Sequence, residues 1–553
     1  MQRNIEPVLV VGGGPVGLAL AGDLGWRGMA CLLIEQSDGS IYQPRMDLVG
    51  IRTMEFCRRW GLVGAVEASP YPRDYAQDNI YLTSMTGHEL GRERFPGIGL
   101  APPPKESPQR RERCPQNMFD PILRAFAQAQ PTVRLRYRTR LVSFTQSADH
   151  VTATVENAGT GEREEILAHT IVGCDGARSL VRETLGLAMR GNPVLTYTTN
   201  VIFRCPHLLS LHDKGKAYRH IFIGPEGTWS TIVAINGRDE WRFSIIGGAE
   251  QREYSKPEIE AAIRRAVGRD FDFEILSVLP WVRRELVAER YRNGRGFIAG
   301  DAAHVMSPTG GFGMNTGIGD AVDLSWKLTA TLQGWGGNAL LDSYSTERQP
   351  IGARNVTEAA GNLRRMLSVD PHPDLLDDTP QGAATRDKVG REISETMRRE
   401  WFTLGVHLGY RYEGSPICLS DGCAAPADNP RMYVPTARPG HRAPHAFLAD
   451  GRSTLDLFGR GFTLLGFGDD VAAEAAPLLE AAKERKVPID FTAIAEPHVA
   501  TLYERRFVLV RPDGHVAWRG DRMPAEPLGV IDVVRGAAGS QAMAAGANAR
   551  QFD

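Results

Sequence analysis

Three glycines near the amino terminus have a spacing that suits the binding of a diphosphate. Gly12, Gly14 and Gly17 form a Gly-x-Gly-x-x-Gly run, with Pro15 inside it, between an apolar strand-like run (8–11) and a helical one (16–28). Gly12 permits a tight turn, Gly14 lets a pyrophosphate approach the backbone, and Gly17 lets helix and strand pack closely. The helix N-terminus adds unpaired N–H groups and partial positive charge.

An acidic residue follows at the expected distance. Glu35 ends the next strand (31–35), 18 residues after Gly17, where its carboxylate can accept from a ribose hydroxyl; Gln36 comes directly after it. Taken alone, Glu35 could equally be a solvated charge at a strand end. Strand, turn, helix and acid together predict a site for an adenine dinucleotide, with FAD and NAD both still open.

A second glycine-rich stretch follows another strand. Gly300 and Asp301 come after residues 297–299, so Asp301 is expected at the carboxyl end of a strand, where open α/β sheets bind ligands. Five of the residues from 309 to 319 are glycine, which lets the backbone lie flat against a planar ring. A helix is predicted from about 315, and its N-terminus can stabilise negative charge on such a ring. The alternative is a glycine-rich surface loop. The residues of this stretch predicted to contact the cofactor are Pro308, Gly311, Gly313, Met314 and Asn315.

These motifs, with Asp175-Gly176 in residues 171–182, resemble those of the single-component flavoprotein aromatic hydroxylases, the group of p-hydroxybenzoate hydroxylase and phenol hydroxylase. The resemblance covers nearly the whole chain and implies FAD, with Asp301 holding the ribityl chain. It places Asp175 in a motif associated with both FAD and the nicotinamide cofactor. It also implies that Arg45 contacts the FAD and that Gln116 lies near the flavin.

The reaction implied by the resemblance needs NAD(P)H and molecular oxygen. NAD(P)H reduces the flavin, oxygen forms a flavin hydroperoxide, and an electron-rich ring attacks its outer oxygen. Ionising a phenol makes the ring more nucleophilic and requires a general base. Asp47 occupies the place of the family's catalytic aspartate; the alternative is an aspartate that only binds a loop amide. His220, Tyr218 and Trp229 are further candidates for the substrate site, or ordinary packing residues.

Two other functions remain open. The glycine stretch and the tail are also similar to the oxygenases that tailor indolocarbazoles and other polycyclic natural products, which would make the substrate a large fused ring. A non-catalytic flavoprotein is the third class, and the three intact motifs speak against it. Asp47 favours a small phenolic substrate.

The pattern of elements predicts an α/β fold. We expect a Rossmann-like (GR2-type) FAD-binding domain, because strand–turn–helix patterns flank a middle region rich in β-branched and aromatic residues. That middle region predicts an inserted antiparallel sheet for the substrate. The expected boundaries are 1–75, 101–188 and 284–365 for the FAD domain, 76–100 and 189–283 for the substrate domain, 366–414 for a helical connection, and 415–553 for a last domain.

The last domain resembles the thioredoxin-like domain of the phenol hydroxylase branch. It contains no CxxC, so dithiol exchange is excluded and a structural or subunit-contact role, as in a homodimer, is inferred. Cys418 and Cys423 suit neither a redox pair nor a metal pair by spacing.

Charge and composition limit the classes of partner and the cellular compartment that we expect. The net charge is −2, so nucleic acid is not an expected partner. No run of 18 apolar residues predicts a membrane span, no metal site is expected, and seven scattered cysteines suit a reducing compartment. We therefore expect a cytoplasmic enzyme.

Overall fold

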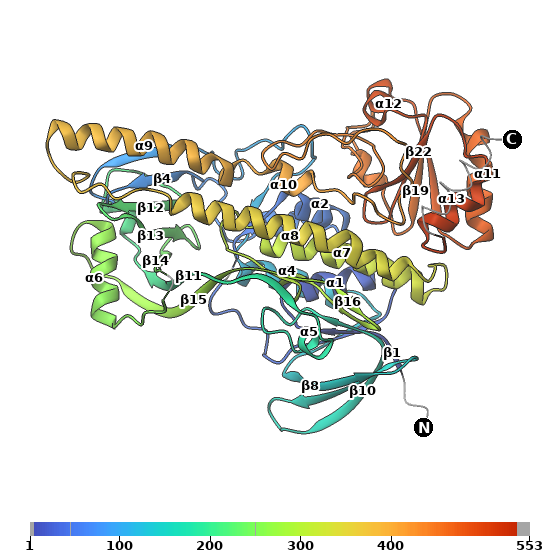
Figure 1. The fold of residues 1–553 in the computed structure, drawn as a ribbon, viewed down its shortest axis with the longest axis horizontal. Helices are drawn as coiled ribbons and strands as arrows, with labels where there is room; N and C mark the ends of the chain where they lie inside the picture. Colours follow the sequence, from blue (N-terminus) through green and yellow to red (C-terminus); the bar gives the residue numbers. More distant parts are fainter. Residues whose placement is uncertain (1–4, 45, 249, 539–553) are drawn as a thin grey trace.

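The computed structural model describes residues 5–44, 46–248 and 250–538. It contains three main sheets, which belong to an FAD-binding domain, an inserted sheet domain and a carboxyl-terminal domain. The expected α/β fold class is confirmed. Figure 1 shows the inserted domain and the carboxyl-terminal domain at opposite ends of an elongated molecule.

We call the first sheet the FAD-binding sheet, after the FAD-binding domain expected from the sequence. Its central strands β10, β1, β2 and β7 are parallel, and β1 ends in a continuous buried apolar run, which is typical of parallel strands covered on both faces. Its order is β16-β17-β10-β1-β2-β7, and β8 and β9 extend it beside β10. The strands are β1 (Ile5–Val11), β2 (Cys31–Ile34), β7 (Val133–Arg136), β8 (Thr139–Gln146), β9 (Val151–Asn157), β10 (Arg163–Gly173), β16 (Arg292–Asn293) and β17 (Gly296–Ile298). The helices beside it are α1 (Pro15–Trp26), α2 (Ile51–Arg59), α3 (Val63–Glu67), α4 (Gln116–Gln128) and α5 (Leu180–Thr184).

We call the second sheet the substrate sheet, after the substrate domain expected from the sequence, and its order is β18-β15-β11-β14-β13-β12-β4-β5. Its strands are β4 (Asn79–Leu82), β5 (Glu89–Glu93), β11 (Met189–Arg204), β12 (Arg219–Gly224), β13 (Gly227–Ala234), β14 (Glu240–Ile246), β15 (Glu274–Ala288) and β18 (His304–Val305). A small separate sheet pairs β3 (Leu48–Val49) with β6 (Glu112–Arg113).

The substrate sheet was expected to be antiparallel, and one of its pairs is parallel. Strands β4 and β12 run in the same direction, because the chain crosses the FAD domain between them. The sheet also contains β18, which lies beyond residue 283, the last residue expected in the substrate domain. Helix α6 (Lys256–Val267) packs on one face of the sheet, through Ile259 and Ile263.

Long helices connect the domains (Figure 1). They are α7 (Gly313–Leu332), α8 (Leu340–Met366), α9 (Pro380–Trp401) and the short α10 (Leu404–Leu408). Helix α9 packs on the second face of the substrate sheet. Helix α7 is buried on all sides from Thr316 to Ala330. The reason is that α7 contacts α1 and α8 while its Trp326 packs with Phe462 of the carboxyl-terminal domain.

The carboxyl-terminal domain has a four-stranded sheet of order β20-β19-β21-β22. Its elements are β19 (Phe462–Phe467), α11 (Val471–Glu484), β20 (Ile489–Ile494), α12 (Pro497–Tyr503), β21 (Phe507–Val510), β22 (Val516–Gly520) and α13 (Pro527–Val534). The parallel β19–β20 pair and the antiparallel β21–β22 hairpin form the expected thioredoxin-like arrangement. Within the described ranges, no helix combines the length and apolar character that a membrane span requires.

Candidate active site

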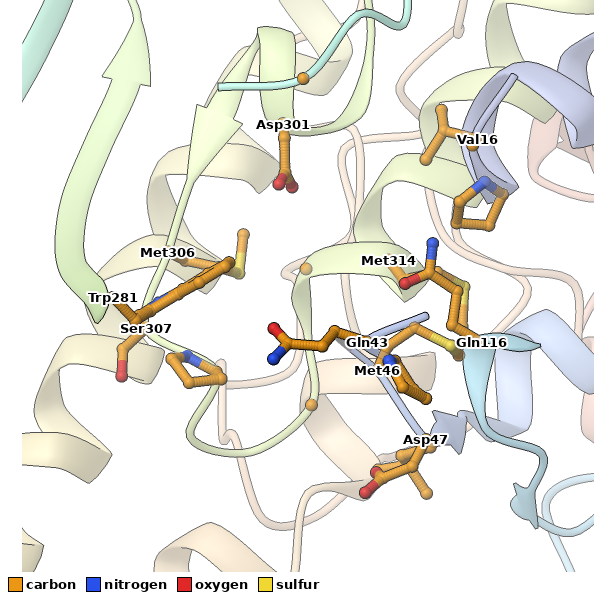
Figure 2. A pocket seen from close by; sticks show the side chains of 18 of the residues that line it. Val16, Gln43, Met46, Asp47, Gln116, Trp281, Asp301, Met306, Ser307 and Met314 are labelled. Atoms are coloured by element: carbon orange, nitrogen blue, oxygen red, sulfur yellow. The ribbon is translucent and has the colours of Figure 1, made fainter. Parts of the chain in front are cut away.

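A cavity of about 540 Å³ lies between the FAD-binding sheet and the substrate sheet. In Figure 2, Asp301 lies at one end of the view and Asp47 at the other, with Gln43, Met46 and Met314 between them. The cavity extends from the glycine turn after β1 to the face of the substrate sheet opposite α6. It can therefore hold an extended cofactor and a ring-shaped substrate side by side.

The glycine turn has the geometry that its three glycines predict. Gly12 has φ +108°, and a Cβ there would lie 2.4 Å from the carbonyl oxygen of Cys174. A Cβ on Gly17 would lie 1.9 Å from the carbonyl oxygen of Gly12, so this residue permits close packing and does not line the cavity. At Gly14, no atom of the described residues lies within 4 Å of the Cβ position. That open space at the start of α1 fits a pyrophosphate.

Glu35 stabilises the turn and also lines the cavity. Its carboxylate accepts from the backbone N–H of Gly13 (2.7 Å) and of Ser37 (2.8 Å). Each carboxylate oxygen can accept a further hydrogen bond, so a ribose hydroxyl still fits there. Gln36 lies beside it in the cavity wall.

Asp301 enters the cavity from a backbone turn that a buried charge network stabilises (Figure 2). The preceding Gly300 has φ +62°, and its N–H donates to Oδ2 of Asp320 over 3.1 Å. His304 Nε2 (2.7 Å) and Arg348 Nε (2.8 Å) bind the same carboxylate. Asp320 thus orients the turn that presents Asp301, although Gly300 itself does not line the cavity.

Asn315 was predicted to contact the cofactor, but its side chain is fully hydrogen-bonded to protein. Oδ1 accepts from Gly50 N–H and the Thr53 hydroxyl, both at 2.7 Å. Nδ2 donates to the carbonyls of Leu48 (3.1 Å) and Gly311 (2.7 Å). Asn315 therefore connects the glycine loop to the segment after Asp47 and does not line the cavity.

Asp175 and Gln116 both line the cavity. The carboxylate of Asp175 accepts from the Ser179 hydroxyl and from Val181 N–H, so it also caps the start of α5. Burial raises the pKa of Asp175. Gln116 begins α4, and its Nε2 donates to Asp120 Oδ2 over 3.1 Å.

Six predicted cofactor residues remain. One of them, Arg45, lies outside the described residues. The others lie in the cavity wall, and they are Pro15, Pro308, Gly311, Gly313 and Met314.

Asp47 lies at the substrate end of the cavity with two close partners. The hydroxyl of Tyr218 donates to Asp47 Oδ2 over 2.6 Å, and Arg113 forms an ion pair with Oδ1 at 2.8 Å. Burial alone would raise the pKa of Asp47, but the charges of Arg113 and Arg242 and the Tyr218 hydrogen bond outweigh it. The pKa of Asp47 is therefore below its ordinary value, and the group is a carboxylate at neutral pH.

His220 does not reach the cavity. Its ring faces the side of the substrate sheet covered by α6, and neither ring nitrogen has a hydrogen-bond partner among the described residues. Burial and the nearby His212 and Arg92 lower the pKa of His220 to about 3. Trp229 also packs on that face, so neither is a candidate for the chemistry. Tyr218, by contrast, lines the cavity. It precedes the first residue of β12, so the alternation of side chains along the strand does not determine which way it points.

Several cavity residues were not found from the sequence. They come from alternate positions of the substrate strands and from the end of α9, and they include Asn200, Arg219, Arg242, Ser244, Trp281, Arg283, Glu400 and Trp401. Alternation marks two possible faces of each strand, but only the pairing of the strands shows which face meets the cofactor.

The turn at Gly12, the inward Asp301 and the glycine loop before α7 define the site of a flavoprotein. Residues 6–359 match a family model described as an FAD binding domain, and residues 436–538 match one described as the carboxyl-terminal domain of an aromatic-ring hydroxylase. The chain belongs to the family of FAD-dependent aromatic-ring monooxygenases. Its cofactor is FAD, and NAD(P)H is the reductant typical of the family.

Known relatives cover almost the whole chain. It is 33% identical to tetracenomycin B2 monooxygenase-dioxygenase from Streptomyces olivaceus, over 97% of this chain and 98% of that protein. It is 30% identical to phenol 2-monooxygenase from Pseudomonas sp., over 96% and 92%. Among solved structures it is similar to RebC soaked with chromopyrrolic acid and containing 7-carboxy-K252c, with TM-score 0.90, 40% identity, and coverage of 97% and 100%.

Proposed function

We propose that this enzyme hydroxylates a phenolic ring, using NAD(P)H and molecular oxygen. The observation that carries the proposal is the hydrogen bond from the Tyr218 hydroxyl to Asp47 at the substrate end of the cavity. Bound FAD, once reduced, supplies the oxygen-activating chemistry. The protein must orient the ring, exclude water and accept the phenol proton.

The pair of Tyr218 and Asp47 is suited to receive that proton. Because Tyr218 donates its own proton to Asp47, its oxygen can accept a hydrogen bond from a substrate hydroxyl. Burial raises the pKa of Tyr218, so this hydroxyl remains protonated at neutral pH and acts as a relay. As the substrate hydroxyl transfers its proton to the Tyr218 oxygen, Tyr218 transfers its own proton to Oδ2 of Asp47, so the proton ends on the carboxylate. Arg113 keeps Asp47 ionised until that transfer, so the carboxylate is free to accept the proton.

A large fused-ring substrate is the second candidate. The cavity wall formed by the substrate sheet carries hydrogen-bonding side chains over several strands, among them Thr198, Asn200, Thr231 and Ser244. Such a wall can contact more than one ring. A tetracenomycin oxygenase and RebC are among the similar proteins, as is a phenol monooxygenase. A polycyclic substrate with a phenolic hydroxyl would fit both candidates, because its hydroxyl could bind Tyr218 while its other rings contact the wall.

The test is NAD(P)H oxidation by the purified holoenzyme, with product identified by mass spectrometry. The panel should contain simple phenols, hydroxylated polycyclic aromatics and the same polycyclic compounds without a hydroxyl. Oxygenated product from hydroxylated compounds only would support the proposal. Equal turnover of compounds with and without a hydroxyl would overturn the role of Tyr218 and Asp47 in proton acceptance.

A further inference from the structure

The turn of the β21–β22 hairpin in the carboxyl-terminal domain is buried. It consists of residues 511–515, which we call the docking turn, and all five are buried. Three of them, Arg511, Asp513 and His515, are ionisable, and each is no more than 2% exposed. Turns normally lie at the surface, because burial costs polar and charged groups their hydration. The docking turn therefore needs partners within the protein.

Two backbone carbonyls of the docking turn accept hydrogen bonds from arginines of the FAD-binding domain. The carbonyl of Pro512 accepts from Arg59 Nη1 over 2.8 Å and from Arg27 Nη2 over 3.3 Å. The carbonyl of Asp513 accepts from Arg52 Nη2 over 2.8 Å. Arg27 directly follows α1, and the other two arginines lie in α2. The docking turn therefore binds α2 and the end of the helix that starts at the glycine turn.

Arg511 connects the docking turn to α7 and α8. Its guanidinium forms an ion pair with Glu347 of α8 at 2.6 Å and donates to Asp323 of α7 over 2.9 Å. Lys327 of α7 binds the same two carboxylates, at 2.5 and 2.7 Å. Burial alone would raise the pKa of Glu347, but Arg511 and Lys327 outweigh it and hold the pKa below its ordinary value. All four side chains are 0% exposed, so the loss of one leaves a buried charge without its partner.

The same two helices support the turn that presents Asp301 to the cavity. Figure 1 shows α7 and α8 side by side, reaching from the middle of the molecule to the carboxyl-terminal domain. Asp320 lies on α7, one turn before Asp323, and its Oδ2 accepts from Gly300 N–H over 3.1 Å. Arg348 of α8 binds Oδ1 of the same carboxylate at 2.8 Å. A shift of α7 against α8 would therefore move the carboxylate that orients this turn.

We propose that the carboxyl-terminal domain takes part in FAD binding, because its docking turn fixes the helices that carry the cofactor loops. Arg511 is the main positioning residue, and it acts through α7 and α8 since it does not line the cavity. Helix α1 starts at the pyrophosphate space and α7 starts in the glycine loop, so fixing both sets the distance between two parts of the cofactor site. The inference concerns the cofactor and does not depend on the substrate.

The coupling can be measured from both directions, because an effect of one site on another is reciprocal. The dissociation constant of FAD is measured by flavin fluorescence, and amide hydrogen exchange of residues 507–520 is followed by mass spectrometry with and without FAD. In the wild type we expect FAD to slow the exchange of these amides. Arg511→Met should weaken FAD binding roughly 5- to 100-fold, the usual range of coupling between sites, and should remove the FAD-dependent protection.

A second variant decides the question if Arg511→Met does not fold. Arg59→Met removes the hydrogen bond to Pro512 from the α2 side. Burial and the charges of Arg27 and Arg52 lower the pKa of Arg59 to about 10, so the fold already disfavours this cation and should tolerate its loss. FAD binding should weaken in the same direction as in Arg511→Met, by a smaller factor.

The matched control is an exposed arginine of the same domain. Arg452 pairs with Asp450 only two positions away, at 2.6 Å, and Arg452→Met should leave both FAD binding and hydrogen exchange unchanged. A loss of FAD affinity in Arg452→Met as large as in Arg511→Met would contradict the specific role of the docking turn.

Two other outcomes would overturn the inference. One is equal exchange of residues 507–520 in the wild-type apoprotein and holoenzyme, since reciprocal coupling requires a difference. The other is wild-type FAD affinity in every variant of Arg511 or Arg59 that folds, even where thermal stability falls. The docking turn would then hold the two domains together without positioning the cofactor site.

Discussion

The hydroxyl of Tyr218 donates to Oδ2 of Asp47 over 2.6 Å, although 171 positions separate the two residues in the chain. The contact joins the substrate sheet to the segment that follows the first βαβ unit of the FAD-binding domain. Arg113 adds an ion pair with Asp47 and lies over the Tyr218 ring, 3.4 Å from its centroid. The three side chains form one unit at the substrate end of the cavity.

The first prediction is that Asp47 and Tyr218 act together. We expect Asp47→Asn and Tyr218→Phe each to reduce the rate of hydroxylation by roughly 100-fold or more, the usual contribution of acid–base groups, while FAD stays bound. The double variant should be little slower than either single one, because residues that act as a unit are not additive. Single-turnover product formation measures this. Tyr254→Phe, in the same domain but outside the cavity, is the control; additive losses would contradict the prediction.

The second prediction concerns pH. The pKa of Asp47 is lowered, so its charged form is favoured and persists throughout the range above its ordinary value of 3.8. Deprotonation of Asp47 therefore cannot produce a rise in kcat between pH 5 and pH 8. We expect the pH–rate profiles of the wild type and Asp47→Asn to have the same shape, displaced to lower rates in the variant. An acid limb near pH 6 that disappears in Asp47→Asn would show that the carboxylate titrates there.

The third prediction is that Gly12 and Gly14 have different roles in the same turn. Gly12→Ala places a Cβ 2.4 Å from the Cys174 carbonyl oxygen at φ +108°, so we expect it to destabilise folding by about 2–5 kcal/mol. In Gly14→Ala the new Cβ has none of the described atoms within 4 Å, so the protein should fold normally. Its methyl group occupies the space for the pyrophosphate, and FAD affinity should fall roughly 100-fold.

Denaturant unfolding of the apoprotein and FAD titration together measure the two effects. If Gly14→Ala binds FAD as well as the wild type, the diphosphate does not approach the backbone at that residue.

The fourth prediction concerns Asn315. Asn315→Asp keeps the oxygen that accepts from Gly50 and Thr53 but loses the two donated hydrogen bonds, whereas Asn315→Ala loses all four. At about 1 kcal/mol for each bond, both variants should be less stable, with Ala the worse. Because Asn315 joins the glycine loop to the Asp47 segment, product formed per NAD(P)H consumed should fall in the same order. Full coupling in Asn315→Ala would exclude this role.

The fifth prediction concerns the contact between the FAD and carboxyl-terminal domains. Glu55 is buried and binds Arg52 at 2.7 Å, and it also pairs with Arg442 from the carboxyl-terminal domain. Burial alone would raise the pKa of Glu55, but Arg442, Arg52 and the Ser107 hydrogen bond lower it to about 2. Because the folded-state pKa lies below the ordinary 4.5, this stabilisation is complete above pH 4.5 and is lost as pH falls toward 2.

Glu55→Gln should therefore lower the free energy of unfolding at pH 7 by about 3–5 kcal/mol, since it leaves Arg442 buried without a charge partner. The decline of stability between pH 4.5 and pH 2 should also become shallower. Urea unfolding at several pH values measures both. Glu392→Gln, at an exposed position of α9, is the control, and an unchanged pH slope in Glu55→Gln would refute the assigned pKa.

Much of the fold was predictable because it depends on local pattern. The apolar run of β1, the turn at Gly12 and the start of α1 are consecutive, so their residue types suffice to predict a dinucleotide-binding unit. The hairpin at Asp513 and Gly514 likewise depends on local residue types, because a short Asp-Gly turn joins two apolar strands, and Gly514 has φ +87°.

The sequence by itself thus determined the fold class, the FAD-binding elements and the family. Tertiary structure decided which side chains meet. His220 was expected beside Tyr218, yet it faces α6, because the register with neighbouring strands sets which face of β12 meets the cavity. Asn315 was expected at the cofactor and instead joins two protein segments. Tyr218 reaches Asp47 only because segments 171 positions apart in the chain pack together in the folded protein; no local pattern carries that information.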